Sequence, residues 1–422
     1  MSGGGELRHH TPGAPGLVVV GGGVAGLRVV QTVRQEGYTG PVTLLGAEPW
    51  LPYDRPPLSK QVLTGDLALD ATGYHPASYF SDEIGVDTVL GVTATGIDVA
   101  RRRLLLADGD ALPYRALVVA TGSRPRRLPF VSPSDGVHVL RTREDAARLR
   151  QDLARAGRLA IVGAGFVGAE VASSAASLGV EVTVVETAPT PLVRAVGAVV
   201  GAELARLHTD AGVRLVCGKA VTGFVGRDRV EGLTLDDGSV LEVDLVLVGV
   251  GVVPDVEWLQ DSGLALDDGL ACDDHLAAGA DAVYGAGDAV SWPSVRLGRR
   301  ARSQQWTTAS DQGRHVGRVL VRGRDEAGPF DHDLYFWSDE YGSRIQGFGA
   351  TAGEAVVLSR DPAKGSFLAG FRAGDVLTGA VGVNAPREFA AVRKRARTDD
   401  SWQAATQHLP PLDVPLPAGA DR

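Results

Sequence analysis

The chain has 422 residues, of which 44% are hydrophobic and 22% charged, and its formal net charge is -9 at pH 7. This length allows two or three globular domains, and the acidic balance argues against a duplex nucleic-acid binder, which needs a dominant basic surface. The two cysteines, Cys217 and Cys272, have no C-x-x-C spacing, so neither a disulfide framework nor a cysteine-ligated metal site is supported. We therefore expect a reduced, cytoplasmic protein without a bound metal.

The two ends of the chain differ in composition from the rest. No run of about 18 apolar residues occurs, and the first residues lack the charged and apolar regions of a signal peptide, so we expect no membrane span. Residues 1–15 are expected to be a disordered lead, and the proline-rich residues 409–422 are expected to be a tail. Such compositions bury too little apolar surface to order themselves.

The first predicted element is an apolar strand from Leu17, followed by a glycine turn, a helix and a second strand. This order is a βαβ unit, and its turn has the dinucleotide-binding spacing Gly21-x-Gly23-x-x-Gly26. The first glycine permits the tight turn, the second lets the backbone reach a pyrophosphate, and the third lets helix and strand pack closely. The helix N-terminus then faces the phosphate charge.

Two later features of the N-terminal part fit a nucleotide-binding lobe. Glu48 follows the second strand, one residue later than the simplest alignment, and is the candidate acid for an adenosine ribose. A further strand ends in Ala120, Thr121 and Gly122, small residues that let the chain pass close to a cofactor or switch between domains.

A second βαβ unit begins at Leu159 and has Gly163, Gly165 and Gly168 in its turn. One such turn alone is also consistent with an ordinary tight turn, but two full units favour two dinucleotides. The second strand of this unit ends in Glu186, where an acid binds ribose hydroxyls. A carboxylate there hydrogen-bonds NADH and repels the 2′-phosphate of NADPH, so we expect NADH. The alternative is a solvated glutamate at a strand end.

Two glycine-rich strand ends follow the second unit. One contains Gly249, Gly251 and Pro254, and the other places Asp288 behind a small-residue turn. An acid in that position forms hydrogen bonds with the ribityl hydroxyls of a flavin, although a turn-forming aspartate is the alternative.

Taken in order, these motifs resemble the two-dinucleotide-binding flavoproteins, which have the glutathione-reductase-like fold. The resemblance implies FAD and NADH as cofactors, with the NADH lobe inserted into the FAD lobe. It predicts an α/β fold with two Rossmann-like dinucleotide-binding domains and a small C-terminal α/β interface domain. The expected boundaries are 16–122 and 253–328 for the FAD-binding domain, 123–252 for the NADH-binding domain and 329–408 for the C-terminal domain.

A missing thiol and four segments indicate the branch of this superfamily. Cys217 is the first cysteine and lies beyond the second glycine turn, so no thiol stands where a disulfide reductase needs one. The segments LPYDRPPLSK from Leu51, RTREDA from Arg141, GAGFVGAE around Glu170 and YFWSDEYGSRIQGFG from Tyr335 resemble those of ferredoxin, putidaredoxin and rubredoxin reductases.

This resemblance implies a candidate catalytic pair, Lys60 and Glu170, in which the lysine lies beside flavin N5 and the glutamate holds it. A cation near N1 or N5 stabilises reduced flavin. The alternatives are a solvated loop lysine and an incidental polar residue in a packed helix. The resemblance also implies that Arg141 meets the FAD pyrophosphate, for which a charged helix start is the alternative. It further implies that Trp306 and Trp337 lie near the flavin, for which core aromatics are the alternative.

The expected cofactor contacts combine the motifs with this resemblance. The expected FAD contacts are Gly21, Gly23, Ala25, Gly26, Glu48, Arg55, Lys60, Ala120, Thr121, Gly122, Arg141, Asp288 and Trp306. The expected NADH contacts are Gly163, Gly165, Phe166, Val167, Gly168, Glu186 and Gly251.

The resemblance also implies an acidic protein partner, a [2Fe–2S] ferredoxin. A reductase with an acidic total must concentrate positive charge where such a partner docks. We expect docking on an arginine patch, for which a solvated arginine surface is the alternative. The patch consists of Arg296, Arg299, Arg300, Arg302, Arg314 and Arg318.

The activity implied is transfer of a hydride from NADH to FAD, followed by single-electron transfer to a ferredoxin that serves a cytochrome P450 or a Rieske oxygenase. One alternative is an NADH reductase of a small acceptor such as a quinone or an ascorbate radical. Another is a flavin-bound redox sensor. Nothing in the sequence decides between a monomer and a dimer.

Overall fold

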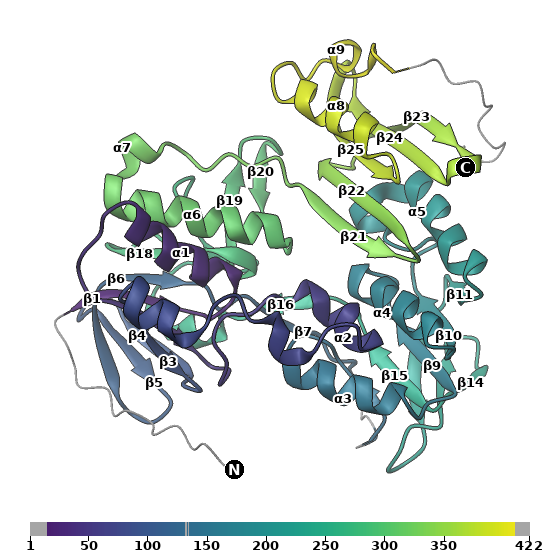
Figure 1. Ribbon diagram of the computed structural model, residues 1–422, viewed down its shortest axis with the longest axis horizontal. Helices are drawn as coiled ribbons and strands as arrows, with labels where there is room; N and C mark the ends of the chain where they lie inside the picture. The colour runs from purple at the N-terminus through teal and green to yellow at the C-terminus, as the bar shows by residue number, and fades with distance from the viewer. Residues whose placement is uncertain (1–14, 131–132, 134, 410–422) are drawn as a thin grey trace. The chain divides into compact units, whose positions relative to one another are not determined.

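The computed structural model describes residues 15–130, 133 and 135–409 (Figure 1). The predicted lead and tail therefore lie outside the described residues, apart from Pro15 and Leu409. The chain divides into two compact units, and each is described by itself. The first unit is Met1–Tyr53, Gly73–Ser123 and Pro254–Asp331, and the second unit is Asp54–Thr72, Arg124–Val253 and His332–Arg422.

The first unit is built on a mainly parallel sheet with the strand order β3–β2–β1–β6–β5–β4, in which β18 also pairs with β6. Every residue of β1 is buried, as expected for a parallel strand that is covered on both faces. Strands β4 and β5 extend the sheet in antiparallel fashion. The strands are β1 (Gly16–Val20), β2 (Val42–Gly46), β3 (Asp87–Leu90), β4 (Ala94–Asp98), β5 (Arg103–Leu106), β6 (Ala111–Val119) and β18 (Val283–Gly285).

Helix α1 (Val24–Gln35) connects β1 to β2 and packs against α6 (Trp306–Arg322), which comes from much later in the chain (Figure 1). The helices approach closely because Gly313 and Gly317 face α1; a Cβ on Gly313 would lie 2.3 Å from the carbonyl oxygen of Ala25. The smaller elements of this unit are η3 (Tyr79–Glu83), η4 (Glu257–Ser262), β17 (Leu270–Ala271), η5 (Gly287–Ala289), β19 (Val290–Ser294), β20 (Arg299–Ala301) and α7 (Arg324–Ala327).

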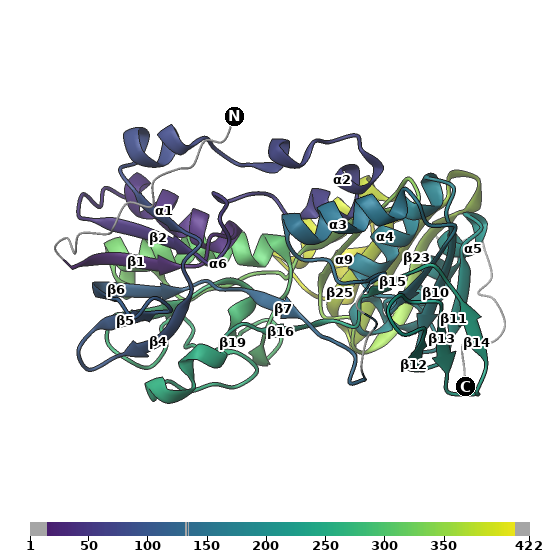
Figure 2. The same ribbon diagram turned by 90° about the horizontal axis from the view of Figure 1, so that it is seen from below.

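The second unit contains a parallel sheet with the strand order β11–β10–β9–β15–β8. Successive side chains of a strand point to opposite faces. Accordingly, Leu159 and Ile161 of β9 join a core with α3 and α4, whereas Ala160 and Val162 join a core with the β12–β13–β14 sheet. The two helices and that smaller sheet lie on opposite faces of the parallel sheet (Figure 2). The elements are β8 (Val137–His138), α3 (Arg143–Leu153), β9 (Arg158–Val162), α4 (Phe166–Ser177), β10 (Glu181–Glu186), α5 (Val193–Asp210), β11 (Arg214–Cys217), β12 (Val221–Val225), β13 (Gly232–Leu235), β14 (Val240–Glu242) and β15 (Leu245–Val248).

Residues 54–72 belong to this second unit although the expected FAD-binding domain included them. They form η1 (Pro56–Ser59), α2 (Gln61–Thr64) and η2 (Leu69–Thr72). The reason is hydrophobic: Leu63 is fully buried in the same core as Leu149 and Val171.

The C-terminal segment also clusters with the second unit. Its antiparallel sheet has the order β21–β22–β25–β24–β23, and one face of that sheet packs on helix α5 through Val196, Val200 and Phe371. The other face is covered by α8, where Phe389 meets Phe348 with ring centroids 5.7 Å apart. The elements are β21 (Phe336–Glu340), β22 (Ser343–Gly349), β23 (Glu354–Asp361), η6 (Pro362–Lys364), β24 (Ser366–Ala373), β25 (Val376–Val383), α8 (Pro386–Ala396) and α9 (Trp402–Thr406).

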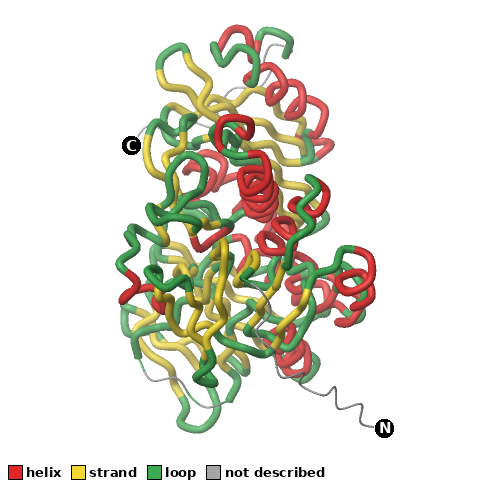
Figure 3. The backbone as a smooth tube through the Cα atoms, turned by 90° about the vertical axis from the view of Figure 1, so that its left-hand side faces the viewer, coloured by secondary structure: helices red, strands yellow, loops and turns green. Residues whose placement is uncertain are grey.

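These elements confirm the predicted α/β class, in which helices and strands are mixed along the chain (Figure 3). Each compact unit contains one Rossmann-like βαβ unit, and a further α/β segment lies at the C-terminus. The short strands β7 (Ser123–Pro125) and β16 (Val252–Pro254) pair with each other. The boundaries of the three predicted domains stay a prediction. The two compact units are defined by packing contacts, whereas the predicted domains are defined by the order of the motifs. Among the described residues, none of the helices has the length and apolar character needed to span a membrane.

Candidate functional sites

The first glycine turn has the geometry that a bound pyrophosphate needs. Gly21 has a φ of +125°, and a Cβ there would lie 2.0 Å from the carbonyl oxygen of Ala120. A Cβ on Gly26 would lie 2.0 Å from the carbonyl oxygen of Gly21. Gly23, the N-cap of α1, has no side-chain cap, and a Cβ there would meet nothing within 4 Å. The first N–H groups of α1 are therefore open to an anion within this unit.

The second glycine turn has the same geometry, with nearly identical backbone angles at the N-cap glycine. The N-cap glycine of α4, Gly165, has φ -80° and ψ 179°, against φ -83° and ψ -175° for Gly23. A Cβ on Gly163 would lie 2.5 Å from the carbonyl oxygen of Gly249, whereas a Cβ on Gly165 would meet nothing within 4 Å. The start of α4, which includes Phe166 and Val167, likewise has no side-chain cap.

Glu186 ends β10 and turns its carboxylate back toward the second glycine turn. Its Oε2 accepts the backbone N–H of Ala164 at 2.7 Å, and its Oε1 accepts that of Ala188 at 2.9 Å. An ionised carboxylate has about four lone-pair sites, so this one retains acceptor capacity for ribose hydroxyls. The candidate acid of the first turn, Glu48, accepts the Tyr53 hydroxyl at 2.5 Å.

The remaining first-unit residues gather around the start of α1. Asp288 is buried in η5, where it accepts the Ser123 hydroxyl at 2.7 Å. The adjacent Gly287 lies so close to α1 that a Cβ on it would be 3.1 Å from that of Ala25. Ala120 likewise lies against Gly21. The segments that contain Gly21, Ala120 and Gly287 are distant in sequence and therefore converge on the first glycine turn.

Three other predicted FAD contacts also lie in this unit. Thr121 donates its hydroxyl hydrogen to the carbonyl oxygen of Asp255 at 2.6 Å, and Gly122 has a φ of +78° that suits glycine. Trp306 begins α6, and its indole N–H donates to the Tyr74 hydroxyl at 3.0 Å.

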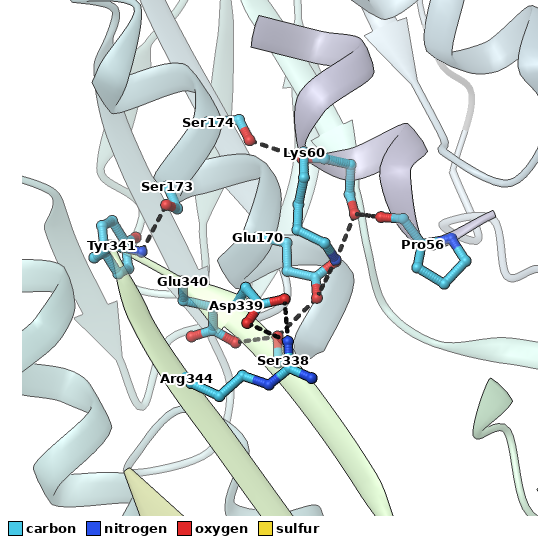
Figure 4. A network of polar contacts seen from close by, with 11 residues as sticks. Pro56, Lys60, Glu170, Ser173, Ser174, Ser338, Asp339, Glu340, Tyr341 and Arg344 are labelled. Atoms are coloured by element: carbon cyan, nitrogen blue, oxygen red, sulfur yellow. Dashed lines mark hydrogen bonds and ion pairs between the residues drawn. The ribbon is translucent and has the colours of Figure 1, made fainter. Parts of the chain in front are cut away.

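The second unit holds the lysine–glutamate pair implied by the resemblance. Lys60 Nζ lies 2.7 Å from Glu170 Oε1, and the two side chains are only 14% and 10% exposed (Figure 4). The Ser59 hydroxyl donates to Glu170 Oε2 at 2.5 Å. Ser174, one helical turn from Glu170 on α4, donates to the carbonyl oxygen of Ser59 at 2.8 Å and so fixes the segment before α2 on α4.

Two predicted arginines also lie in the second unit. Arg55 Nη1 donates to the carbonyl oxygen of Arg141 at 2.5 Å. The backbone N–H of Arg141 donates to Asp145, which forms the capping box of α3 with Thr142. The structure therefore brings Arg55 and Arg141 together at the start of α3.

Sequence reasoning missed Ser338 and Glu340 of β21. The Ser338 hydroxyl lies 2.7 Å from Glu170 Oε1 and 2.9 Å from Glu340 Oε1 (Figure 4). Glu340 is only 1% exposed, and burial raises the pKa of its carboxyl to about 8. A signal was present: Phe336, Ser338 and Glu340 alternate along a strand, so a buried phenylalanine predicts that both polar side chains point inward.

The proposed arginine patch belongs to the first unit and is largely ion-paired. Arg299 and Arg318 are exposed and have no acidic partner among the described residues. The other four have one each: Arg296 with Asp331 at 2.8 Å, Arg300 with Asp267 at 3.8 Å, Arg302 with Asp268 at 3.1 Å and Arg314 with Asp311 at 2.6 Å.

One group in the described part of the chain has the spacing of metal ligands, namely Asp273, Asp274 and His275. Arg324 contacts all three, at 2.6 Å from Asp273, 3.7 Å from Asp274 and 3.2 Å from His275 Nδ1. The guanidinium supplies the positive charge that these acids need.

A cavity of about 400 Å³ lies in the second unit beside β8. Its lining includes Arg127, His138, Arg148 and Asp152. None of the residues expected to bind NADH lines it, so it adds nothing to the nucleotide site.

Comparison with known proteins shows which families the chain matches. Residues 15–313 match the protein family described as pyridine nucleotide-disulphide oxidoreductase, and residues 335–410 match the family described as reductase C-terminal. The ferredoxin reductase component of chlorobenzene dioxygenase from Cupriavidus sp. strain PS12 is 37% identical over 381 residues, covering 89% of this chain and 90% of that protein.

Two solved structures are similar over nearly their whole length. The ferredoxin reductase for the CYP199A2 system from Rhodopseudomonas palustris has a TM-score of 0.87 and 34% identity, covering 93% of this chain and 97% of that one. The covalent putidaredoxin reductase–putidaredoxin complex gives a TM-score of 0.86 and 30% identity, covering 93% and 95%.

Proposed function

The chain belongs to the pyridine nucleotide-disulphide oxidoreductase family, and from this premise we propose that it is an FAD-dependent NADH:ferredoxin oxidoreductase. The resemblance to ferredoxin reductases that the sequence indicated is confirmed. The observation that carries the proposal is the pair of matching glycine turns, one in each unit, each at an uncapped helix N-terminus. Two such turns in one chain provide for two dinucleotides.

FAD would be held by the turn between β1 and α1 and by the residues that converge on it. Gly23 and the first N–H groups of α1 would bind the pyrophosphate, because nothing in this unit caps them from a side chain. Glu48 would bind the adenosine ribose and Asp288 the ribityl chain. Arg55 and Arg141 stay predicted FAD contacts, because a guanidinium group has the charge that suits a phosphate. When bound, FAD accepts a hydride and releases electrons one at a time.

NADH would be held by the turn between β9 and α4. Glu186 is pre-set for this role, since two backbone N–H groups fix its carboxylate beside the turn. A carboxylate so fixed accepts ribose hydroxyls and repels a 2′-phosphate. The site should therefore prefer NADH to NADPH.

Lys60 is the proposed cation for the negative charge of reduced flavin. Glu170 and the segment fixed by Ser174 hold its ammonium group in one place. Preorganised charge of this kind costs no rearrangement at the moment of reaction.

The state of the thiols supports an acceptor outside the chain. Both cysteines are free, and burial raises the pKa of Cys272 to about 12. Burial and the charge of Glu186 also raise the pKa of Cys217. A thiol is a poor nucleophile unless its pKa is lowered, so neither cysteine is suited to dithiol chemistry. Free thiols also support the proposed cytoplasmic location.

The proposed acceptor is a [2Fe–2S] ferredoxin that serves a cytochrome P450 or a Rieske oxygenase. The relatives named above support this acceptor through their own ferredoxin partners. The arginine patch is its proposed docking surface, with Arg299 and Arg318 as the members whose charge no acid offsets among the described residues.

Stopped-flow absorbance tests the function. We expect NADH to bleach bound flavin faster than NADPH does, and a [2Fe–2S] ferredoxin to reoxidise it at a rate that falls with salt. The matched variant Glu186→Gln should keep flavin reduction but lose much of the preference for NADH. A purified protein that binds no flavin would overturn the proposal, and reduced flavin that no ferredoxin reoxidises would overturn the proposed acceptor.

A further inference from the structure

The buried cluster on α4 and β21 contains two carboxyl groups that share one serine hydroxyl. Ser338 Oγ lies 2.7 Å from Glu170 Oε1 and 2.9 Å from Glu340 Oε1 (Figure 4). A serine has a single hydrogen to donate. If both acids were ionised, one of these two short oxygen–oxygen contacts would contain no proton. One of the two carboxyl groups must therefore be protonated.

The geometry places that proton on Glu340. Glu170 is surrounded by three donors, namely Lys60, Ser59 and Ser338, as an ionised carboxylate requires. Glu340 has no cation within ion-pairing distance among the described residues, and its Oε2 is buried without a hydrogen-bond partner. A buried charge in such surroundings is costly, whereas a neutral acid can donate to Ser338.

The other titratable groups around Glu340 already balance without it. Asp339, its neighbour on β21, is paired with Arg344 of β22 at 2.8 Å, and Glu170 of α4 is paired with Lys60. Tyr341 follows on the same segment and meets His208 of α5 at 2.7 Å. Burial raises the pKa of Tyr341 and lowers that of His208 to about 4, so both are neutral at neutral pH. An ionised Glu340 would add one uncompensated negative charge.

We propose that Glu340 is a proton-bearing positioning residue, which donates to Ser338 as a neutral acid so that Ser338 donates to Glu170 and Glu170 holds Lys60. Loss of this proton reverses the first hydrogen bond, turns Ser338 toward Glu340 and removes one of the donors that hold Glu170. The position and surroundings of the Lys60 ammonium then depend on pH. Only the consequence for the flavin rests on the proposed function.

That consequence has a direction. When Ser338 turns toward Glu340, Glu170 loses one of the donors that hold it, so the Lys60 ammonium is less firmly placed and its effect on reduced flavin, which is itself anionic, is weaker. We expect reduction by NADH to slow at alkaline pH by about tenfold, the effect that one weakened charge-assisted hydrogen bond supports.

Infrared difference spectroscopy tests the proton directly and needs no substrate. The carbonyl stretch of a protonated carboxylic acid is separate from that of a carboxylate. We expect such a band in the purified protein at neutral pH, lost on titration with a midpoint of about 8. Glu340→Gln, which keeps the shape and a donor, should abolish the band. Asp339→Asn, which removes the neighbouring exposed carboxylate, should retain it.

The pH profile of flavin reduction by NADH tests the link to Lys60. The wild-type rate should fall through pH 8, while Glu340→Gln and Ser338→Ala should both give flat profiles. Ser338→Ala should keep the infrared band, because it breaks the link but leaves the acid. Absence of the band at neutral pH, its persistence in Glu340→Gln, or a wild-type profile in Ser338→Ala would each overturn the inference. Failure of NADH to reduce the flavin in every variant would instead count against the proposed function and leave the infrared result standing.

Discussion

At the scale of single residues, Lys60 and Glu170 are a buried ion pair whose partners depend on each other. Both side chains lie at least 86% out of contact with solvent, and Glu170 receives two serine hydroxyls in addition to the ammonium group. Removing one member of a buried pair leaves the other charge uncompensated, whereas removing both relieves that cost.

We therefore predict strong coupling between two substitutions. Lys60→Met should lower the free energy of unfolding by about 3 kcal/mol, because it strands the Glu170 carboxylate. The double variant Lys60→Met/Glu170→Gln should cost less than Lys60→Met alone. Urea unfolding at neutral pH measures both, with Arg344→Met, which breaks a half-exposed ion pair, as a control expected to cost about 1 kcal/mol or less. Additive losses in the double variant would contradict the prediction.

At the scale of elements, the two glycine turns separate positions that serve the fold from positions that serve the ligand. Gly163 has a φ of +101°, and a Cβ there would lie 2.5 Å from a backbone oxygen. Gly165 has φ -80°, which any residue adopts, and open space where a Cβ would stand. The fold therefore does not require glycine at the second position, and we attribute the requirement to the bound dinucleotide.

This difference predicts opposite behaviour for two equally small changes. Gly165→Ala should change the free energy of unfolding by about 0.5 kcal/mol or less, since it is unstrained. It should nevertheless weaken NADH binding, because the added methyl group lies where the pyrophosphate approaches. Gly163→Ala should lower stability markedly through strain and backbone contact. Thermal unfolding together with the KM for NADH separates the two effects; equal stability losses would refute the assignment.

The turns could be predicted from the sequence because glycine spacing records a local backbone requirement. The arrangement of Gly21, Gly23 and Gly26 depends on residues a few positions apart. By contrast, the attachment of residues 54–72 to the second unit depends on Leu63 meeting Leu149 and Val171, contacts that no local pattern encodes.

The same reason explains why the site was only partly visible in the sequence. Lys60 and Glu170 came from a resemblance, since nothing local links positions so far apart. Glu340 was missed because its burial depends on β21 packing beside α4, where the backbone N–H of Tyr341 donates to Ser173 at 2.7 Å. Its inward direction was encoded in the alternation of β21, but its neighbours were not.

At the scale of the whole molecule, the net charge of -9 and the expected acidic partner repel each other, so docking depends on local charge. Arg299 and Arg318 are exposed without an acidic partner in the described ranges, whereas Arg314 is paired with Asp311 at 2.6 Å. A paired arginine contributes a smaller net field at a distance.

We predict that Arg299→Ala and Arg318→Ala raise the KM for ferredoxin and reduce its salt dependence, with kcat for flavin reduction by NADH unchanged. Arg314→Ala is the matched control from the same helix as Arg318 and should have the smaller effect. Steady-state ferredoxin reduction at several ionic strengths measures the difference. Equal effects of all three variants would show that local ion pairing does not shape the docking surface.

Stability should also depend on pH through buried groups in both units. Burial lowers the pKa of His208 in the second unit and of His315 in the first unit from 6.5 to about 4. Between these values the unfolded chain binds more protons than the folded one, so stability is lost as pH falls from 6.5 toward 4, by up to about 1.4 kcal/mol per pH unit for each histidine.

Glu340 acts with the opposite sign. Its pKa rises from 4.5 to about 8, so the folded chain binds the extra proton and stability is lost as pH rises through this interval, levelling off above 8. From these three groups we predict a maximum of the unfolding midpoint near pH 6.5, where the histidine contribution is complete and that of Glu340 is still falling. Glu340→Gln should remove the alkaline decline and steepen the acid side between pH 4.5 and 6.5, because Glu340 opposes the two histidines there. Urea midpoints of both proteins across this pH range measure the two sides separately, and an unchanged alkaline decline in Glu340→Gln would assign that decline to other residues.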